Sequence, residues 1–319
     1  GGRVDQPTLC RAPGELVTYS IVARDPATGE LGIGAQSHFF GVGRLVGWGE
    51  AGVGVVATQG FVNVDYGPRA VAVLRAGASA RQAIDMVTGA DPLSAYRQLG
   101  VVDSAGVAAS FTGDRCAPVA GGLLGDGVAV QGNMLERPQV YHDMLAAYRA
   151  ANGPLAERIL VAMRAAEESG GDIRGSQSAV LTVFGDQRSD TPWQHVLVDI
   201  RVDDHPDPVS ELARLLPRQR AFDAIGDVMF ASDLMIGPYR NVSPELLSEK
   251  LTGLADAAAL LGPDNREAQF WAAVLMARSG DRDGARSLFA ELFSYRPALR
   301  DFLVGIGPLG FLDDVAEYR

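Results

Sequence analysis

The order in which strand and helix patterns follow one another is the feature that most limits the fold. Apolar, β-branched stretches come in pairs joined by tight turns: Pro26–Gly29 follows residues 18–24, and Asp103–Gly106 separates residues 98–102 from 107–111. Pairs of amphipathic helices separate these hairpins. Tight hairpins require antiparallel neighbours, whereas a doubly wound sheet needs a crossover helix after each strand. The pattern therefore predicts an antiparallel-rich α+β domain and does not fit a Rossmann fold.

The remaining elements of this domain are predicted from the same signals of periodicity, caps and turns. We expect further strands over residues 31–35, 52–59, 127–131, 179–184 and 195–202. We expect helices over residues 68–76, from 79 onward, 136–151, 154–168 and 208–230. Ser79 with Gln82 three residues later is a capping box, which supports the second of these helices.

From Ser243 onward the chain is nearly all helical by pattern. Asp264–Glu267 begins one helix, Ser279–Asp281 ends it, and Asp283–Tyr295 forms its partner. The pair resembles one or two tetratricopeptide-like (TPR-like) units, which are too few for a solenoid. We therefore expect three parts: residues 1–17, a leader or extension that is disordered or removed; residues 18–238, the α+β domain; and residues 239–319, a small all-helical domain.

Charge and hydropathy narrow the class of partner. The chain carries 28 Lys plus Arg against 39 Asp plus Glu, and its net charge of -11 repels phosphate backbones and anionic lipid. No apolar run approaches the ~20 residues that span a bilayer, and no signal-peptide pattern is visible. We expect a cytoplasmic protein that binds neither nucleic acid nor membrane. Cys10 and Cys116 are too few and too isolated for a disulfide framework or a zinc site, so we expect no metal.

The distribution of basic residues excludes several mechanisms. All but one of them are arginine, and the single lysine, Lys250, lies far along the chain in the helical part. Schiff-base chemistry, a P-loop and a Ser-Lys dyad each need a lysine at the site. None of these can operate in the N-terminal domain.

Several short sequence blocks lie one after another along about residues 18–230. They include Thr18–Asp25, Gly52–Gln59, Thr112–Cys116, Gln131–Asn133, Gly170–Gly175, Gln177–Ala179 and Val202–Pro206. In content and spacing they resemble the DUF1028 family, whose members resemble the N-terminal-nucleophile (Ntn) hydrolases. The resemblance implies a four-layer αββα sandwich. The C-terminal part resembles a module of some members that carries a peptidoglycan-binding label.

The resemblance implies a nucleophile at Thr18. In an Ntn hydrolase the first residue supplies both the hydroxyl and its base, the α-amine, whose pKa lies near 8. Here Thr18 follows seventeen other residues. The role requires that the chain start at Thr18, for instance because Val17 is the true initiation site, or that it be cleaved there. The alternative is a genuine extension that blocks the chemistry and leaves Thr18 an ordinary strand threonine.

Amide side chains at strand ends are the next candidates. Gln131 and Asn133 end one apolar strand and Gln59 ends another, and a side-chain amide can stabilise the oxyanion of a tetrahedral intermediate. Burying an unpaired amide costs roughly 1–3 kcal/mol, so amides at such positions are unusual. We expect Gln131 and Asn133 to act with Thr18 and Gln59 to contact substrate. Each amide could instead fasten a loop by bonding its backbone.

Arginine must supply any positive charge near Thr18. Arg24, Arg97, Arg115 and Arg174 are available, and Arg174 is the best placed because it lies in a glycine-rich loop. A guanidinium suits the clamping of a carboxylate better than proton transfer. The alternative for Arg174 is a salt bridge with Asp172. Ser37, Asp172 and Arg115 complete the candidate substrate-binding set.

Two other motifs indicate a function less specifically. Cys116 is an alternative nucleophile, but the sequence offers no nearby histidine or other base for it. Asp203–Pro206 resembles a metal or triad fragment, although Asp and Pro there more simply end a strand and begin the next helix.

The function expected from these residues is hydrolysis of an amide bond through an acyl-enzyme on Thr18. The substrate would be a small amide-containing molecule or a peptide, no cofactor is expected, and the protein would be a homo-oligomer. The alternative is a catalytically inactive relative that serves as a binding module for a small molecule or a protein.

Overall fold

The computed structural model describes residues 18–318. The predicted leader over residues 1–17 lies outside the described residues. The chain divides into two compact units between Arg214 and Leu215. We describe each unit by itself.

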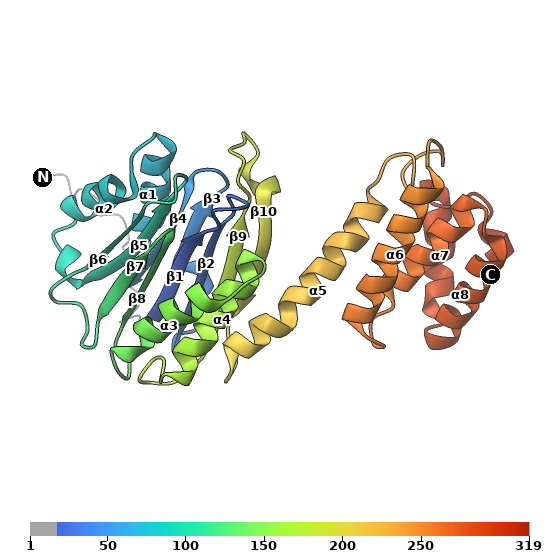
Figure 1. Ribbon diagram of the computed structural model, residues 1–319. Coiled ribbons are helices and arrows are strands. Elements are labelled where there is room, and N and C mark those ends of the chain that lie inside the picture. Colours follow the sequence, from blue (N-terminus) through green and yellow to red (C-terminus); the bar gives the residue numbers. More distant parts are fainter. Residues whose placement is uncertain (1–17, 319) are drawn as a thin grey trace, which may run out of the picture. The chain divides into compact units, whose positions relative to one another are not determined.

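The first unit is built on two antiparallel sheets (Figure 1). The six-stranded sheet has the order β10-β9-β2-β1-β8-β7 and the four-stranded sheet the order β3-β4-β5-β6. The strands of the larger sheet are β1 (Thr18–Arg24), β2 (Leu31–Ser37), β7 (Gly121–Gly125), β8 (Val128–Asn133), β9 (Ser178–Phe184) and β10 (Val196–Val202). Those of the smaller sheet are β3 (Gly47–Glu50), β4 (Gly54–Gly60), β5 (Arg97–Asp103) and β6 (Ala108–Thr112).

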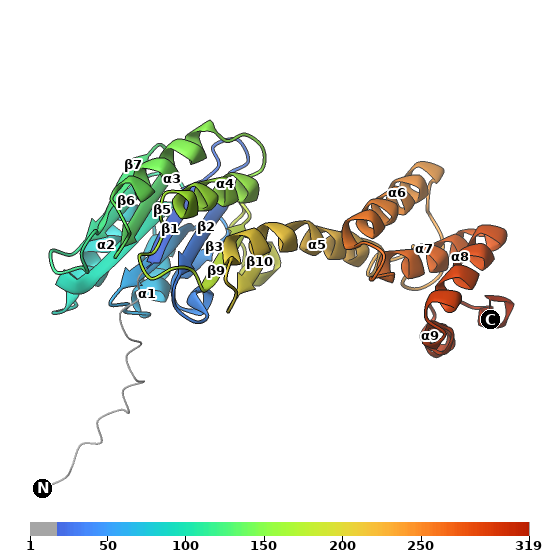
Figure 2. The ribbon, with the colours of Figure 1, turned by 90° about the horizontal axis from the view of Figure 1, so that it is seen from below.

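Two pairs of helices lie against these sheets. Helices α1 (Tyr66–Arg75) and α2 (Ala80–Gly89) contact the four-stranded sheet, and α3 (Gln139–Ala150) and α4 (Leu155–Glu168) contact the six-stranded sheet. Figure 2 shows α3 and α4 along one side of the strands and α1 along the other. The expected capping box of α2 is present, since Ser79 and Gln82 bond each other's backbone N–H groups.

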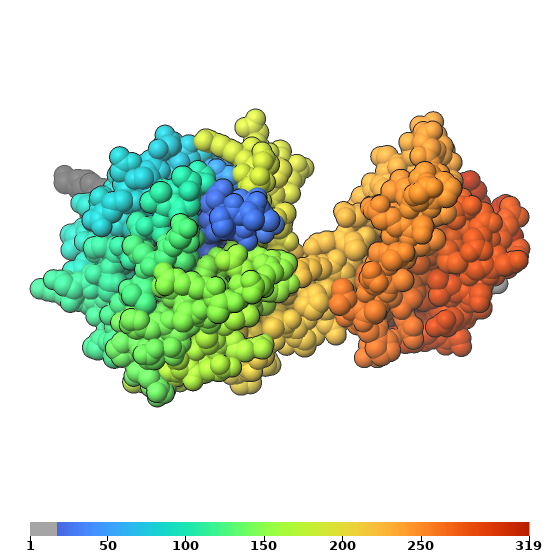
Figure 3. All heavy atoms as spheres, viewed as in Figure 1, coloured from blue at the N-terminus to red at the C-terminus, as the bar shows by residue number. Residues whose placement is uncertain are grey.

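The two sheets also contact each other, and an apolar core fills most of the space between them. Its members come from both sheets and from the turn after β2, and include Val22, Ile33, Val55, Val102 and Ala129. Because β1 and β2 are interior strands, little of them reaches the surface. The space-filling view shows only a small dark blue patch of this part of the chain (Figure 3).

The structure confirms the mixed α+β class and the antiparallel sheets. Strand β1, the hairpins and both helix pairs lie where the sequence predicts them, within a few residues at the ends. Two strands were not predicted, β3 and β7. Their sequences, Gly-Trp-Gly-Glu and Gly-Gly-Leu-Leu-Gly, are rich in glycine and contain no β-branched residue, so strand propensity gives only a weak signal from Trp48 in β3 and none in β7.

Helix α5 (Pro208–Met229) runs across the division between the units. Ala221, Ile225 and Val228 belong to the apolar core of the second unit, which is why the division falls inside α5 and before the boundary at 238/239 that the sequence indicates. The other helices of this unit are α6 (Pro244–Leu261), α7 (Glu267–Ser279), α8 (Arg282–Tyr295) and α9 (Ala298–Ile306).

The second unit is held by aromatic packing. Phe270 and Phe289 are almost fully buried and meet edge to face, with ring centroids 5.9 Å apart. Gly280, at a φ of 93°, ends α7 as the sequence predicts. Within residues 18–318, none of the helices combines the length and the apolar character that crossing a bilayer requires.

Candidate functional site

Four neighbouring strands of the six-stranded sheet begin or end along one edge of it, the edge that is formed by strand ends and where β1 starts. Because neighbouring strands are antiparallel, β1 and β9 begin at this edge while β2 and β8 end there. Thr18 pairs with Asn133, and Ser37 pairs with Ser178. All four side chains are fully buried. Strand pairing therefore gathers hydroxyl and amide groups from four distant segments at the position of Thr18.

The side chains of Thr18 and Asn133 point into the space between the sheets. Side chains alternate between the two faces of a strand, and Thr18 lies two and four residues before Ser20 and Val22, the second of which belongs to the core between the sheets. Asn133 stands in the same relation to Ala129 on β8. We use the name amide network for the buried polar residues that meet here from both sheets: Thr18, Ser20, Gln59, Gln98, Gln131 and Asn133.

Gln98 on β5 is the anchor of the amide network. Its Nε2 lies 3.1 Å from the carbonyl oxygen of Gly121 and 2.9 Å from that of Gly132. Backbone carbonyl oxygens only accept hydrogen bonds, so the group that faces them must be the NH2 of Gln98. The orientation of this amide, which is commonly ambiguous, is therefore fixed by the backbone.

The orientation of Gln98 determines that of its two amide neighbours. Its Oε1 accepts from Gln59 Nε2 at 2.8 Å and from Asn133 Nδ2 at 3.1 Å. Gln59 Nε2 also donates to the carbonyl oxygen of Thr18, at 3.2 Å. Both neighbours must therefore turn their NH2 groups toward Gln98 and their oxygens away from it.

The direction of the bonds continues through Ser20 to Gln131. Gln59 Oε1 can only accept, so the Ser20 hydroxyl donates to it, at 2.6 Å. Having used its proton, Ser20 Oγ accepts from Gln131 Nε2, also at 2.6 Å. Gln131 Oε1 is then left pointing away from Ser20, into the space that Gly100 opens on β5. A Cβ at Gly100 would lie 2.1 Å from this oxygen, so any larger residue there would displace the Gln131 amide from its present position.

Within residues 18–318, three buried atoms of the amide network have no hydrogen-bond partner: Thr18 Oγ1, Gln131 Oε1 and Asn133 Oδ1. Each such atom costs roughly 1–3 kcal/mol. Both free amide atoms are oxygens, which accept hydrogen bonds. An oxyanion needs donors, so in this arrangement Gln131 and Asn133 do not offer the groups that the predicted oxyanion role requires. The atoms that are free suit a hydrogen-bond donor next to Thr18.

Asp172 and Arg174 lie in a loop that reaches the same edge. Asp172 forms an isolated bridge with Leu135, two residues beyond Asn133. The buried Asp172 carboxylate accepts from the backbone N–H groups of His38 and Arg174, each at 2.9 Å, and pairs with the Arg174 guanidinium at 3.2 Å. The salt bridge considered for Arg174 is thus present. A substrate carboxylate bound by Arg174 would compete with Asp172 for it.

The opposite face of β1 carries a second polar group that the sequence did not reveal. Tyr19 Oη donates to Glu167 Oε1 at 2.5 Å, and the Ser176 hydroxyl bonds the other carboxylate oxygen. Burial raises the pKa of Glu167 above its usual range, although the bonds from Ser176 and Tyr19 oppose that shift. Burial and the neighbouring Glu167 also raise the pKa of Tyr19. These bonds tie α4 and the loop of Asp172 to the residue next to Thr18.

Gln36 is an unusual neighbour of Tyr19. It is the cross-strand partner of Tyr19 on β2 and is fully buried. Neither atom of its side-chain amide has a hydrogen-bond partner. It lies on the helix-facing side of the sheet, away from the amide network.

The other predicted residues fall in different places. Ser37 lies in the buried row at the sheet edge, and its carbonyl oxygen accepts from the N–H of Gln177 at 3.2 Å. Arg115 is exposed, and its guanidinium donates to the Tyr96 hydroxyl at 3.2 Å, outside the amide network. Burial raises the pKa of Cys116 to about 11, which keeps the thiol protonated near neutrality and disfavours it as a nucleophile.

The segment Asp203–Pro206 connects β10, which ends at Val202, to α5, which begins at Pro208. This confirms the simpler reading of that motif. Throughout residues 18–318, no group of three or more His, Cys, Asp or Glu side chains is arranged to hold a metal ion.

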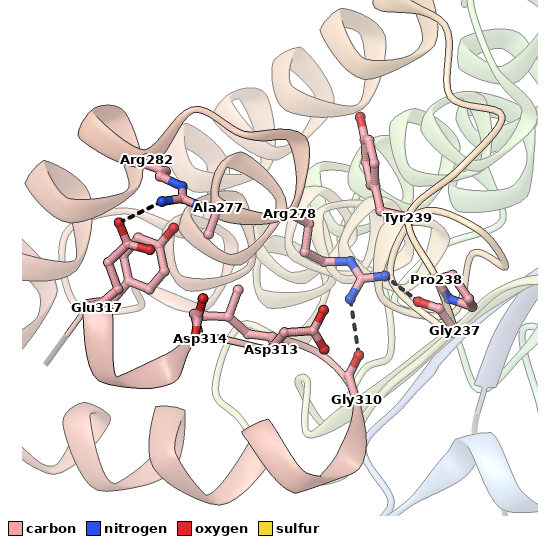
Figure 4. Close-up of a pocket in the computed structure, with 12 residues that line it drawn as sticks. Gly237, Pro238, Tyr239, Ala277, Arg278, Arg282, Gly310, Asp313, Asp314 and Glu317 are labelled. Atoms are coloured by element: carbon pink, nitrogen blue, oxygen red, sulfur yellow. Dashed lines mark hydrogen bonds and ion pairs between the residues drawn. The ribbon is translucent and has the colours of Figure 1, made fainter.

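A hollow in the second unit has a structural explanation. It is lined by Arg278 and by acidic residues that include Asp313 and Glu317 (Figure 4). The Arg278 guanidinium donates to the backbone carbonyl oxygens of Leu234, at 2.7 Å, and of Phe311, at 2.9 Å, among others. Its donors are therefore used to hold the turns around α7.

The family model described as "Family of unknown function (DUF1028)" matches residues 18–212. The chain belongs to the DUF1028 family. A crystal structure of protein SPO2555 from Silicibacter pomeroyi, which carries the same family model, is similar to it with 33% sequence identity and a TM-score of 0.57. The similarity covers 63% of this chain and 84% of that one. No curated protein matches this chain. The matched region contains the whole amide network, from Thr18 to Asn133.

Proposed function

We propose that this DUF1028 protein hydrolyses an amide bond by Ntn chemistry, with Thr18 as the nucleophile once its α-amine is free. The two sheets and their helices would then be the four-layer αββα sandwich of the Ntn hydrolases. The substrate is a small amide-containing molecule or a peptide. The proposal rests on one observation above all: the Thr18 hydroxyl is fully buried at the first position of an interior strand and has no hydrogen-bond partner among the described residues.

A buried, unpartnered hydroxyl calls for a reason because it destabilises the fold. Most buried polar groups are hydrogen-bonded, and an exception calls for a specific explanation, such as strain, a bound water or ion, or a catalytic role. The hydroxyl of Thr18 is also surrounded by a polar network that crosses the space between two sheets, where apolar side chains would pack with less cost. Together these features support a role for Thr18 beyond strand formation.

The chemistry would proceed in two halves. The Thr18 Oγ attacks the carbonyl carbon of the substrate while the α-amine takes the hydroxyl proton, directly or through one water. The C–N bond then breaks, the leaving amine receives that proton, and the acyl group remains as an ester on Thr18. Water, deprotonated by the same amine, cleaves the ester and restores the hydroxyl.

The test is to compare the full chain with a protein that begins at Thr18 after removal of an initiator methionine. Both are treated with a broad acylating probe, and the adduct is located by mass spectrometry. We expect labelling at Thr18 in the trimmed protein only, because the nitrogen of Thr18 cannot accept a proton while it is part of a peptide bond. Thr18→Ala in the trimmed protein is the control and should abolish the adduct.

Three outcomes would refute this proposal. Equal labelling of both forms at Thr18 would show that the α-amine is not the base. Labelling at Cys116, or at no residue of the trimmed protein under conditions that acylate a known Ntn hydrolase, would leave the binding-module alternative.

A further inference from the structure

The amide network contains a positioning residue that follows from its hydrogen-bond directions. Resting on the proposed function, we infer that Asn133 Oδ1 holds the α-ammonium group of Thr18, and that Gln98 is the residue that turns the Asn133 amide so that this oxygen is available. Asn133 then serves the base of the reaction and not the oxyanion.

The number of donors and acceptors supports this inference. In the sequence as it stands the nitrogen of Thr18 belongs to a peptide bond with Val17 and carries one hydrogen. Asn133 Oδ1, on the residue paired with Thr18, is a buried acceptor without a donor. A free α-ammonium group offers three hydrogens in place of one. Freeing the α-amine of Thr18 therefore adds hydrogen-bond donors at the end of β1, where Asn133 Oδ1 lacks a donor.

Gln98 makes the orientation of Asn133 obligatory. Turning the Asn133 amide over would bring its oxygen to the position, 3.1 Å from Gln98 Oε1, that its Nδ2 now occupies, and two acceptors would face each other. Gln98 cannot turn to relieve this, because its NH2 is held by the carbonyl oxygens of Gly121 and Gly132. The carbonyls of β7 and β8 thereby determine which atom of Asn133 is free.

An acceptor beside the ammonium favours its protonated form and so raises its pKa relative to a variant without the acceptor. The charged groups around this position come from several elements. Asp172 and Arg174 of the loop are paired with each other, Glu167 of α4 lies across β1 with Tyr19, and His38 follows β2. The facing strands β4 and β5 contribute the uncharged Gln59 and Gln98. Replacing Asn133 removes none of the charged groups.

The first measurement needs no turnover. In the protein that begins at Thr18, the side-chain ¹⁵N and ¹H signals of Asn133 are followed by NMR as the pH is varied. We expect them to shift with an apparent pKa between about 6 and 9, the range of a perturbed α-amine. In the full chain the Thr18 nitrogen is part of a peptide bond and the terminal amine lies seventeen residues earlier, so the Asn133 signals should not shift in this range. Equal behaviour of the two forms would overturn the inference, whether or not the protein is a hydrolase.

The second measurement uses the pH dependence of Thr18 acylation in the trimmed protein. We expect Asn133→Ala and Gln98→Met to move the acidic limb to lower pH by about half a unit or more, because the first removes the acceptor of the ammonium and the second removes the group that keeps this acceptor turned toward it. The matched control is Gln36→Leu, which alters a buried glutamine on the other face of the sheet and should leave the limb in place. If the variants lose stability but keep the wild-type limb, Gln98 has only a structural role. Should Gln98→Met not fold, Asn133→Ala alone decides the question.

Discussion

The space between the two sheets has a polar end and an apolar end that are built from the same strands. Along the inward face of β1 the residues are Thr18, Ser20 and then Val22. On β4 the order from the polar end is Gln59, Ala57, Val55. On β5 the order from the polar end is Gln98, Gly100, Val102, and on β8 it is Asn133, Gln131, Ala129. All of these positions are buried, so exposure does not explain why one end is polar.

The two ends are specified by different physics. The apolar end needs side chains of the right volume, and a swap of similar size costs little there. The polar end needs donors and acceptors in the right direction, because each buried bond in it has a fixed donor. A change at the polar end should therefore propagate from residue to residue, while a change at the apolar end should stay local. The following variants test this contrast.

The largest effect is expected for Gln98→Met in the full chain. Methionine fills the space but cannot bond, so the amides of Gln59 and Asn133 and the carbonyl oxygens of Gly121 and Gly132 all lose a partner. With roughly 1–3 kcal/mol for each strongly affected group and some relief by rearrangement, we expect a loss of about 4 kcal/mol in the free energy of unfolding. Urea denaturation measures it. Gln187→Met, at an exposed glutamine, is the control, and a comparable loss for both would mean that the network does not stabilise the fold.

Ser20→Ala should have an intermediate effect. It removes the donor to Gln59 Oε1 and an acceptor from Gln131 Nε2, which keeps only its long bond of 3.4 Å to the Ser20 carbonyl oxygen. We expect a loss of about 2 kcal/mol in the free energy of unfolding. In the double variant with Gln98→Met the two losses should be less than additive, because the residues belong to one network. Additive losses would contradict the propagation described above. Ser104→Ala, in an exposed turn, is the matched control.

Ile33→Val tests the apolar end. Ile33 is fully buried on the inward face of β2, and the change removes one methylene group without altering any hydrogen bond. We expect a loss of about 1 kcal/mol, additive with that of Ser20→Ala. Coupling between Ile33→Val and Ser20→Ala larger than the experimental error would show that the two ends are not independent.

The sequence shows which segments form the strands around the space between the sheets. It does not show which of these strands pair or face each other. Alternation and turn residues locate β1, β2, β4 and β8, and amides at the ends of apolar runs single out Gln59, Gln131 and Asn133. Gln98 and Ser20 have no such mark. Gln98 stands at the beginning of an apolar strand, and Ser20 is an unremarkable residue within one. Their importance appears only when β5 faces β1 and β8.

The direction of the hydrogen bonds in the amide network is a further property that no single segment of the sequence encodes. The free oxygen of Asn133 follows from the carbonyl groups of Gly121 and Gly132, and β7, which carries Gly121, has no propensity signal. Arg115 illustrates the reverse case. Its charge and its place in a sequence block make it a candidate, and the fold leaves it exposed beside Tyr96. The charge of a residue does not show whether its side chain points into the space between the sheets or toward solvent.

The smallest effect, and the one with a distinctive sign, is expected for Thr18→Val in the full chain. Valine has the shape of threonine and replaces the hydroxyl with a methyl group. At most buried positions this costs stability because a hydrogen bond is lost, but Thr18 Oγ1 has no partner to lose in the part of the chain that the structure describes. Removing a buried, unsatisfied hydroxyl should leave the free energy of unfolding unchanged or raise it by up to about 1 kcal/mol. Ser20→Val, two positions along the same face, is the comparison and should destabilise the protein. A loss of 1 kcal/mol or more for Thr18→Val, by the same denaturation measurement, would mean that the hydroxyl is bonded in the folded protein, and the main support for Thr18 as a residue kept for function would be gone.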